Sequence, residues 1–357
     1  MQRELARLLV MEGTTMYFVS LTGDRYQIGF QHGRKLRGII HYAVRNRCRF
    51  YKDRRRPSPA ALQRRVRGIE SNFPELMEEM RGIADGSQLS LDDILFYNLS
   101  PIPEGCSNVA FPSGCRPMLG HVNDQVGGDL DVAFHIRPTQ GPEILQIGAA
   151  GSVGTGAAVN SGGLAISHAC ARGGGIKNSD AYLNLPVLRR LLIDRTCNCQ
   201  EARHFLSTYC FAIGADNIIC ADRAGNAFVA EKLPTMVEFR EPAGRGIYCT
   251  GRALTPAIRS VVRQDAYEEG EPQTIAPLIA REKLFAEALA KPEQALSLRL
   301  MQQLLQNSDE GIEVSNKNST WAAVLVPSDF EMWIADGIPC HSKFTRIHRT
   351  SRCRFIL

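Results

Sequence analysis

The stretch Pro101-Ile102-Pro103-Glu104-Gly105-Cys106-Ser107-Asn108-Val109-Ala110-Phe111 is the most informative part of the sequence. Two prolines and a glycine lead into a cysteine, and an apolar run typical of a strand follows it. Because glycine adopts backbone angles closed to other residues, the Gly105–Cys106 bond can be held under strain. A strained amide beside a thiol can pass its acyl group from nitrogen to sulfur. Hydrolysis of that thioester would leave Cys106 as a new N-terminus.

A cysteine at the start of a chain carries a nucleophile and a base together. The α-amino group titrates near ~7.7–8.0, close to working pH, and it lies within reach of the thiol on the same residue. Such a site needs no separate catalytic histidine. A carboxylate and hydrogen-bond donors elsewhere in the chain would orient the amine and hold the oxyanion. The alternative interpretation of Cys106, considered alone, is a buried structural thiol at the start of a strand.

The pattern of apolar residues changes near residue 105. Before it, helical spacing dominates, at residues 35–51, in the segment that begins at Pro74 and stops near Gly86, and in the segment that Ser90 can cap. After it, short apolar segments alternate with glycine-rich turns. These predicted strands are residues 108–111, 130–136, 143–147, 163–168, 217–221, 227–230, 237–240, 322–326 and 331–335. Helices are expected among them at residues 187–193, 199–206, 276–290 and 298–305. Strands beside helices in this order predict an α+β fold, with sheets covered by helices.

Five ordered stretches resemble the C45 family of autoproteolytic acyltransferases and hydrolases, which includes acyl-CoA:isopenicillin N acyltransferase. They are Gly23–Gly33 with its I-G-x-x-H-G ending, Glu78–Gly86 followed by Asp92–Leu95 and Asn98, Gly105-Cys106 with its strand, Gly120–Asp124, and the weaker Asn160–Ala165. Asp124 lies 18 positions after Cys106, which also matches the family pattern. The resemblance spans most of the chain.

This resemblance implies an N-terminal-nucleophile (Ntn) hydrolase, which is a four-layer αββα sandwich. The precursor would cut itself between Gly105 and Cys106 into an α-chain, 1–105, and a β-chain, 106–357, which stay associated as one Ntn domain. It implies Cys106 as nucleophile, the freed amine as base, and Asp124 as the residue that orients the amine and assists self-cleavage. The alternative for Asp124 is a turn aspartate. For His32 and Gly33 we expect a packing role in the α-chain.

Two positions depart from the family pattern. Where an oxyanion asparagine is expected, this chain has Cys249-Thr250-Gly251-Arg252, so the Thr250 hydroxyl and the Gly251 N–H are the candidate donors. Where an arginine is expected, the chain has Lys317, which keeps the charge but lacks the planar fork of a guanidinium. Lys317 and His168 are the candidates for substrate binding. These departures bear on the choice of substrate and on catalytic efficiency more than on the fold.

The expected reaction is acyl transfer from a small N-acyl amide or acyl thioester to water or an amine, through an acyl-Cys106 intermediate. No metal or other cofactor is expected. Two alternatives remain open. One is a thiol hydrolase with a Cys106/His121 or Cys106/His168 dyad, active without chain cleavage. The other is a catalytically inactive binding protein on the same fold.

Composition sets the remaining limits. The chain has 357 residues, of which 44% are apolar and 22% charged, as in ordinary globular proteins. It lacks an apolar run of about 18 residues, so we expect no membrane span. The 11 cysteines include no C-x-x-C pair, and no signal peptide is evident. We therefore expect mostly free thiols, no metal site and a reducing cytoplasm.

The net charge of +5 is concentrated in part of the chain. Ten basic residues lie between Arg45 and Arg67, against one acid, Asp53. This stretch is either a solvated face or a patch for an anionic partner such as a phosphorylated acyl carrier. No motif accompanies it that would indicate a nucleic acid as partner.

Overall fold

The structure is a computed structural model. It describes residues 16–51, 57–100, 104–113, 116–125, 130–171, 182–209, 213–262, 275–292, 295–349 and 351. Arg54, Arg55 and Arg56, the densest part of the basic stretch, lie outside the described residues. None of the described helices is long and apolar enough to cross a bilayer.

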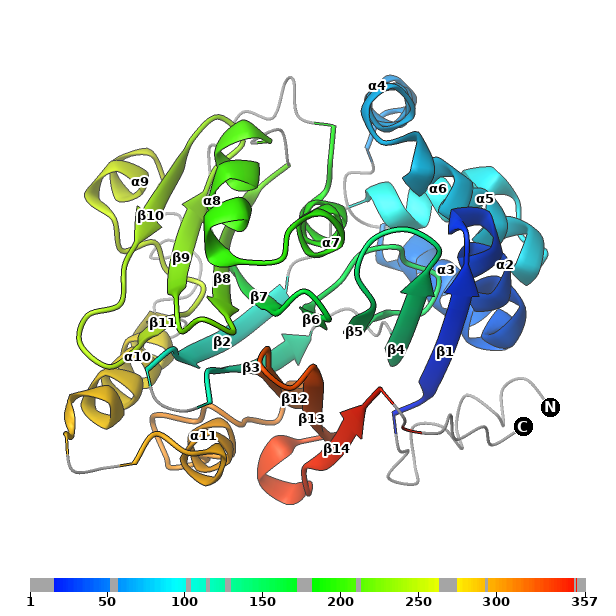
Figure 1. Cartoon of the computed structure of the whole chain (residues 1–357). Coiled ribbons are helices and arrows are strands. Elements are labelled where there is room, and N and C mark those ends of the chain that lie inside the picture. The colour runs from blue at the N-terminus through cyan, green and yellow to red at the C-terminus, as the bar shows by residue number, and fades with distance from the viewer. Residues whose placement is uncertain are drawn as a thin grey trace.

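Two sheets stack face to face and form the middle of the molecule (Figure 1). The large sheet has the order β1 (Phe18–Gly23), β4 (Asp131–Pro138), β5 (Ile144–Ala149), β6 (Ala157–Asn160), β7 (Leu164–Ala171), β8 (Ala215–Asp222), β9 (Ala227–Lys232), β10 (Val237–Arg240). The small sheet has the order β11 (Ile247–Cys249), β2 (Glu104–Phe111), β3 (Met118–Gln125), β12 (Ser319–Val326), β13 (Glu331–Asp336), β14 (Thr345–His348). Neighbouring strands are antiparallel except β1 and β4, which are parallel.

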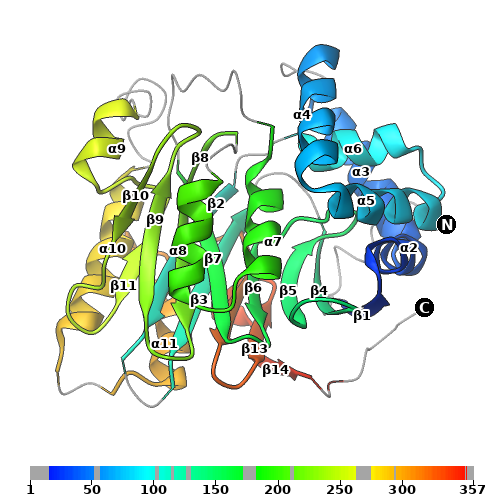
Figure 2. The same cartoon turned by 45° about the horizontal axis from the view of Figure 1, so that its top comes forward.

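Helices cover the outer face of each sheet (Figure 2). Those on the large sheet are α2 (Arg25–Lys35), α3 (Arg37–Phe50), α4 (Pro59–Asn72), α5 (Pro74–Ser87), α6 (Leu91–Leu99), α7 (Leu185–Arg195) and α8 (Cys199–Thr208). Those on the small sheet are α10 (Ile275–Ala290) and α11 (Leu298–Leu305). The short α9 (Pro256–Val261) packs near β10, and a 3₁₀ turn, η3 (Pro339–His341), precedes β14. Three apolar layers separate these four layers, so the predicted αββα sandwich is confirmed.

The expected helices and strands are present, mostly with small shifts at their ends. Strand β10 and helix α11 have the predicted bounds, and Ser90 caps α6 through the Asp93 N–H. Helix α5 runs one residue beyond the predicted stop at Gly86, because Gln88 takes the left-handed conformation that ends it. The N-terminal part, in which helical spacing dominates, also contributes a strand, β1, which joins the large sheet beside β4.

Glycines explain two of the family-like stretches. Helices α2 and α5 pack so closely that a Cβ on Gly29 would lie 2.0 Å from the Glu79 carbonyl oxygen, and one on Gly82 would lie 2.2 Å from the Tyr26 carbonyl oxygen. Gly33 has the same kind of contact with Ile83. The first two stretches therefore provide helix packing, as we expected for His32 and Gly33.

Candidate active site

Strand β2 begins at Glu104, earlier than the sequence predicts, and so the proposed cleavage point lies inside the small sheet. Gly105 is opposite Asp124 and Cys106 is opposite Asn123 in the ladder with β3. Successive side chains of a strand point to opposite faces. Cys106 faces the core between the two sheets, where it is 1% exposed, and its Sγ lies 3.6 Å from Oδ1 of Asn123.

Asp124 lies on the other face of the ladder, toward α10. Its Oδ2 accepts a hydrogen bond from Nη1 of Arg281 at 2.9 Å. Its Oδ1 accepts from Asn316 Nδ2 at 3.0 Å and from Ser319 Oγ at 2.6 Å. Asp124 is therefore a strand residue, and the alternative of a turn aspartate is wrong. The carboxylate is held beside the Gly105–Cys106 backbone, and it does not point toward the thiol.

Arg281 was not identified from the sequence, although it is central to this arrangement. It is 6% exposed, and the same Nη1 that binds Asp124 also donates to Ser107 Oγ at 3.0 Å. One guanidinium thus links β2, which carries Cys106, to β3. Only the helical spacing of α10 could have indicated that this arginine points inward.

The Thr250 hydroxyl is already engaged. It donates to Oε1 of Glu282 at 2.6 Å, and Arg252 forms an ion pair with the same carboxylate. Burial raises the pKa of Glu282, and the hydrogen bond from Thr250 and the charge of Arg252 oppose that rise. In this uncut chain the hydroxyl is therefore directed to Glu282.

Of the two candidate oxyanion donors, Gly251 is better placed than Thr250. The β11 register pairs Cys249 with Asn108, and continuing it would bring Gly251 level with Cys106. Nδ2 of Asn217 donates to the carbonyls of both Thr250 and Arg252 at 2.7 Å, so the backbone on either side of Gly251 is fixed. Asn217 is another residue that the sequence did not single out.

The two candidates for substrate binding lie in different surroundings. Lys317 is exposed, in the turn between Asn316 and Ser319, the two residues that bind Asp124. His168 is wholly buried, and its Nδ1 lies 3.3 Å from Oδ1 of Asp216. The structure does not bring Lys317 and His168 together.

A cation would fit poorly at His168. This histidine, Cys170 and Asp216 are near enough to share a metal ion. However, Arg189 donates to Oδ2 of Asp216 at 2.7 Å. Burial alone would raise the pKa of Asp216, but Arg189 and His168 outweigh it and lower the pKa to about 2. The charge of Asp216 is therefore already balanced within the protein.

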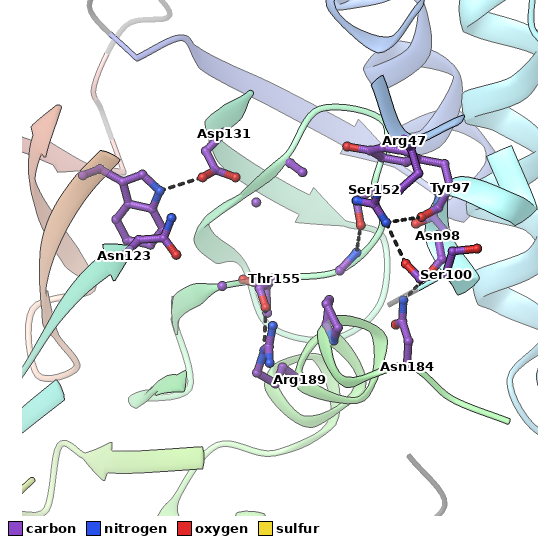
Figure 3. Close-up of a pocket in the computed structure, with 16 residues that line it drawn as sticks. Arg47, Tyr97, Asn98, Ser100, Asn123, Asp131, Ser152, Thr155, Asn184 and Arg189 are labelled. Atoms are coloured by element: carbon purple, nitrogen blue, oxygen red, sulfur yellow. Dashed lines mark hydrogen bonds between the residues drawn. The ribbon is translucent and has the colours of Figure 1, made fainter. Parts of the chain in front are cut away.

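A small hollow, with a cavity volume of about 50 Å³, is lined by Asn123, the ladder partner of Cys106 (Figure 3). Asn123 lies at one side of it, Asp131 between, and Arg47, Tyr97 and Ser100 at the far side. Nη1 of Arg47 donates to the carbonyls of Tyr97 and Ser100 at 3.1 and 2.7 Å. The hollow therefore connects Asn123, the neighbour of Cys106, with the end of α6.

Two arginines of the basic stretch turn inward at that end of α6. Besides Arg47, Arg65 donates to the Leu99 carbonyl at 2.5 Å. Cations at a helix C-terminus are stabilising because the terminal carbonyls lack partners within the helix. Arg47 and Arg65 therefore stabilise the end of α6, and these two arginines are engaged within the protein.

The cysteines match the expectation of free thiols. No disulfide joins any two of the eight cysteines within the described ranges. Burial raises the pKa of Cys249 to about 12 and raises the pKa of Cys220 further. These two thiols are poor nucleophiles near neutral pH, since the thiolate is the reactive form.

Fold and site together define the class of the molecule as an αββα sandwich with a cysteine early in a central strand. Three solved structures are similar to it. An N-acylethanolamine-hydrolyzing acid amidase orthologue from Caenorhabditis elegans has 15% identity and a TM-score of 0.46, covering 62% of this chain and 93% of that one. A penicillin V acylase from Agrobacterium tumefaciens has 12% identity and a TM-score of 0.44, covering 69% of this chain and 86% of that one. A mutant of conjugated bile acid hydrolase from Clostridium perfringens has 7% identity and a TM-score of 0.48, covering 68% of this chain and 92% of that one.

No protein-family profile and no curated protein sequence matches the chain. The structural likenesses are distant, so the function is argued below from the residues of this chain.

Proposed function

We propose that the chain is a self-cleaving cysteine Ntn amidohydrolase or acyltransferase of the C45 type. The observation that carries this proposal is the pairing of Gly105 with Asp124, next to a buried Cys106 thiol. Without these neighbours, the Gly105–Cys106 peptide bond would be an ordinary bond within a strand. Here a carboxylate fixed by three donors lies opposite the residue whose peptide bond would be cut.

Cleavage would convert the Cys106 nitrogen from an amide into an amine. Asp124 would then hold that amine while the amine takes the proton of the Sγ thiol. The thiolate attacks the carbonyl of the substrate, and the acyl group passes to sulfur as the amine or thiol leaving group departs. Water or a second amine then attacks this thioester, which releases the product and restores the thiol.

The developing oxyanion needs donors on the inner face of β2. The Gly251 N–H is our candidate, because Asn217 fixes its loop and the β11 register, if continued, would bring Gly251 level with Cys106. Removing a single oxyanion donor typically lowers kcat by about 10²–10³. Substrates would be small N-acyl amides or acyl thioesters, with Lys317 at the exposed rim as a further binding residue.

The test is the mass of the purified protein. Wild type should consist of two fragments, 1–105 and 106–357, that copurify, while Cys106→Ala should remain one chain. An acyl donor should add mass to the 106–357 fragment alone, at Cys106. Intact wild-type chain with full activity would favour the Cys/His hydrolase instead. Intact chain without activity toward any N-acyl amide or thioester would favour a binding protein.

A screen of matched donors separates the two reactions. Each acyl group is offered both as an amide and as a thioester, with and without an acceptor amine. Loss of the Cys106 adduct that accelerates with the amine indicates a transferase. A rate that no amine changes indicates a hydrolase.

A further inference from the structure

His121 is a fully buried histidine on the same sheet face as the Cys106 thiol. In the β2–β3 ladder Cys106 is opposite Asn123 and His121 is opposite Asn108. His121 is therefore the diagonal neighbour of Cys106. Diagonal pairs on one face of an antiparallel ladder have their Cβ atoms about 7–8 Å apart or less, which is within reach of a ring side chain.

The hydrogen bonds of Asn108 fix the tautomer of His121. Nδ2 of Asn108 donates to the His168 carbonyl at 2.8 Å, so its Oδ1 is the atom that lies 2.8 Å from Nδ1 of His121. An amide oxygen only accepts, and so Nδ1 carries the proton. Ser167 Oγ, 2.7 Å from the same nitrogen, is compatible with this assignment. In the neutral ring Nε2 then has a lone pair.

No atom of the described residues meets ordinary hydrogen-bond geometry with Nε2, although the side chain is 0% exposed. The side chain of Asn123 acts only as a weaker hydrogen-bonding neighbour of the ring. An unsatisfied buried polar atom destabilises a protein and therefore calls for an explanation. Burial, with the nearby His168 and Arg189, lowers the pKa of His121 well below its ordinary value, against a smaller opposite effect of Asn123. The ring is therefore neutral near pH 7, and the lone pair is available.

The uncut chain lacks the base that the mature enzyme would use. Before cleavage the nitrogen of Cys106 is an amide, which does not accept a proton near neutral pH. The first attack of the thiol on Gly105 therefore needs another proton acceptor. We propose that Nε2 of His121 is this acceptor, a base that serves self-cleavage before the α-amine exists. The inference rests on the proposed function.

The step balances within the protein and one water. His121 takes the proton from Sγ, and the thiolate attacks the Gly105 carbonyl carbon. The bond from this carbon to the Cys106 nitrogen breaks as the imidazolium returns the proton to that nitrogen. A Gly105 thioester and a free amine result. Water then hydrolyses the thioester to the Gly105 carboxylate and the Cys106 thiol. The thiolate raises the proton affinity of the adjacent ring while the pair exists.

A purely structural role is the alternative. The His121 ring packs against Trp321 with centroids 4.7 Å apart, so any loss of the ring leaves a space in the core. Chemical rescue separates the two roles. His121→Gly leaves room for an added five-membered ring. Imidazole restores both volume and basicity, whereas pyrazole restores the same volume with far weaker basicity.

The experiment follows self-cleavage of freshly purified full-length precursor by mass spectrometry. We expect His121→Gly and His121→Gln to cleave at least about 100-fold more slowly than wild type, the lower range for loss of a general base. Imidazole should accelerate His121→Gly several-fold, and pyrazole should not. His135→Gln is the matched control, because His135 is buried in β4 of the other sheet and bonded to Glu143.

Three outcomes would overturn the inference. They are wild-type rates in both His121 variants, equal rescue by pyrazole and imidazole, and an equal slowing in His135→Gln. If His121→Gly shows no cooperative unfolding transition, the rate of His121→Gln decides. A wild-type chain that never cleaves overturns the proposed function itself, and this result is distinguishable from cleavage that is indifferent to His121.

Discussion

Gly105 and Asp124 face each other across the β2–β3 ladder, on the sheet face opposite the Cys106 thiol. This relationship separates two tasks. On the α10 face, Arg281 binds Ser107 and Asp124, next to the peptide bond proposed to be cut. On the inner face, Asn123 contacts the sulfur and His121 is the diagonal neighbour of Cys106. A carboxylate on the α10 face, such as that of Asp124, can orient an amine at Cys106 without placing a negative charge next to the thiolate on the inner face.

Asp124→Asn tests the first task. The change keeps the volume of the side chain but removes its charge. It also replaces one of the two accepting oxygens by an NH2 group, so the donors from Arg281, Asn316 and Ser319 can no longer all bind as they do to the carboxylate. We expect self-cleavage to slow about 100-fold, the scale on which lost positioning acts, with the fold retained. Mass spectrometry over time gives the rate, and circular dichroism checks the fold.

The control is Asp329→Asn, which neutralises an exposed carboxylate that pairs with Arg116. It should cleave at the wild-type rate. If Asp124→Asn does the same, Asp124 is a structural strand residue and has no part in the chemistry.

Arg281→Met tests whether the guanidinium acts through Asp124. Methionine keeps much of the stem but loses the donor to Ser107 and Asp124. We expect slower self-cleavage than in wild type, and the double variant with Asp124→Asn should be little slower than the worse single variant, since residues of one network are not additive. Arg299→Met on the exposed side of α11 is the control. Additive losses would mean that Arg281 acts independently of Asp124.

Thr250→Val tests the assignment of the oxyanion donor. An essential donor would lower kcat by about 10²–10³. Because the hydroxyl is directed to Glu282, we expect a loss in kcat of less than about 10-fold. The free energy of unfolding should fall by about 1.5–3 kcal/mol, the range for a hydrogen bond to a charged group. Urea unfolding and steady-state rates measure the two effects. A loss in kcat of about 100-fold without any change in stability would return Thr250 to the oxyanion hole.

The sequence pattern predicted an α+β fold and most strands, because alternation and turn residues are local signals, whereas the four-layer sandwich was implied by the family resemblance. It missed β3 as a strand, since Gly120-His121-Val122-Asn123-Asp124 mixes polar and apolar residues on both faces. The polar side chains there serve the site on each face, so burial does not follow a simple alternation. Arg281 and Asn217 were also missed. Their partners are 157 and 33 positions away in the chain, and only the folded sheets bring them together.

The last prediction concerns the association of the two fragments after cleavage. Glu79 of α5 is 1% exposed and accepts hydrogen bonds from Nη1 and Nη2 of Arg190 at 3.0 and 3.1 Å. Arg190 belongs to α7, on the other side of the proposed cut, and it also pairs with Asp194. A buried ion pair therefore spans the interface between 1–105 and 106–357.

Breaking a buried pair by removing one partner destabilises a protein by about 3–5 kcal/mol, because the remaining charge is left without compensation. In Glu79→Gln, Asp194 still offsets part of the Arg190 charge, so we expect the lower end of that range. The cleaved variant should release the 1–105 fragment at urea concentrations at which the wild-type fragments still coelute in size-exclusion chromatography. Glu78→Gln is the matched control, since Glu78 pairs with Arg81 at the surface, where such pairs contribute about 0–1 kcal/mol. If Glu79→Gln and Glu78→Gln dissociate at the same urea concentration, the pairing of β1 with β4 and the apolar core hold the fragments together without help from this ion pair.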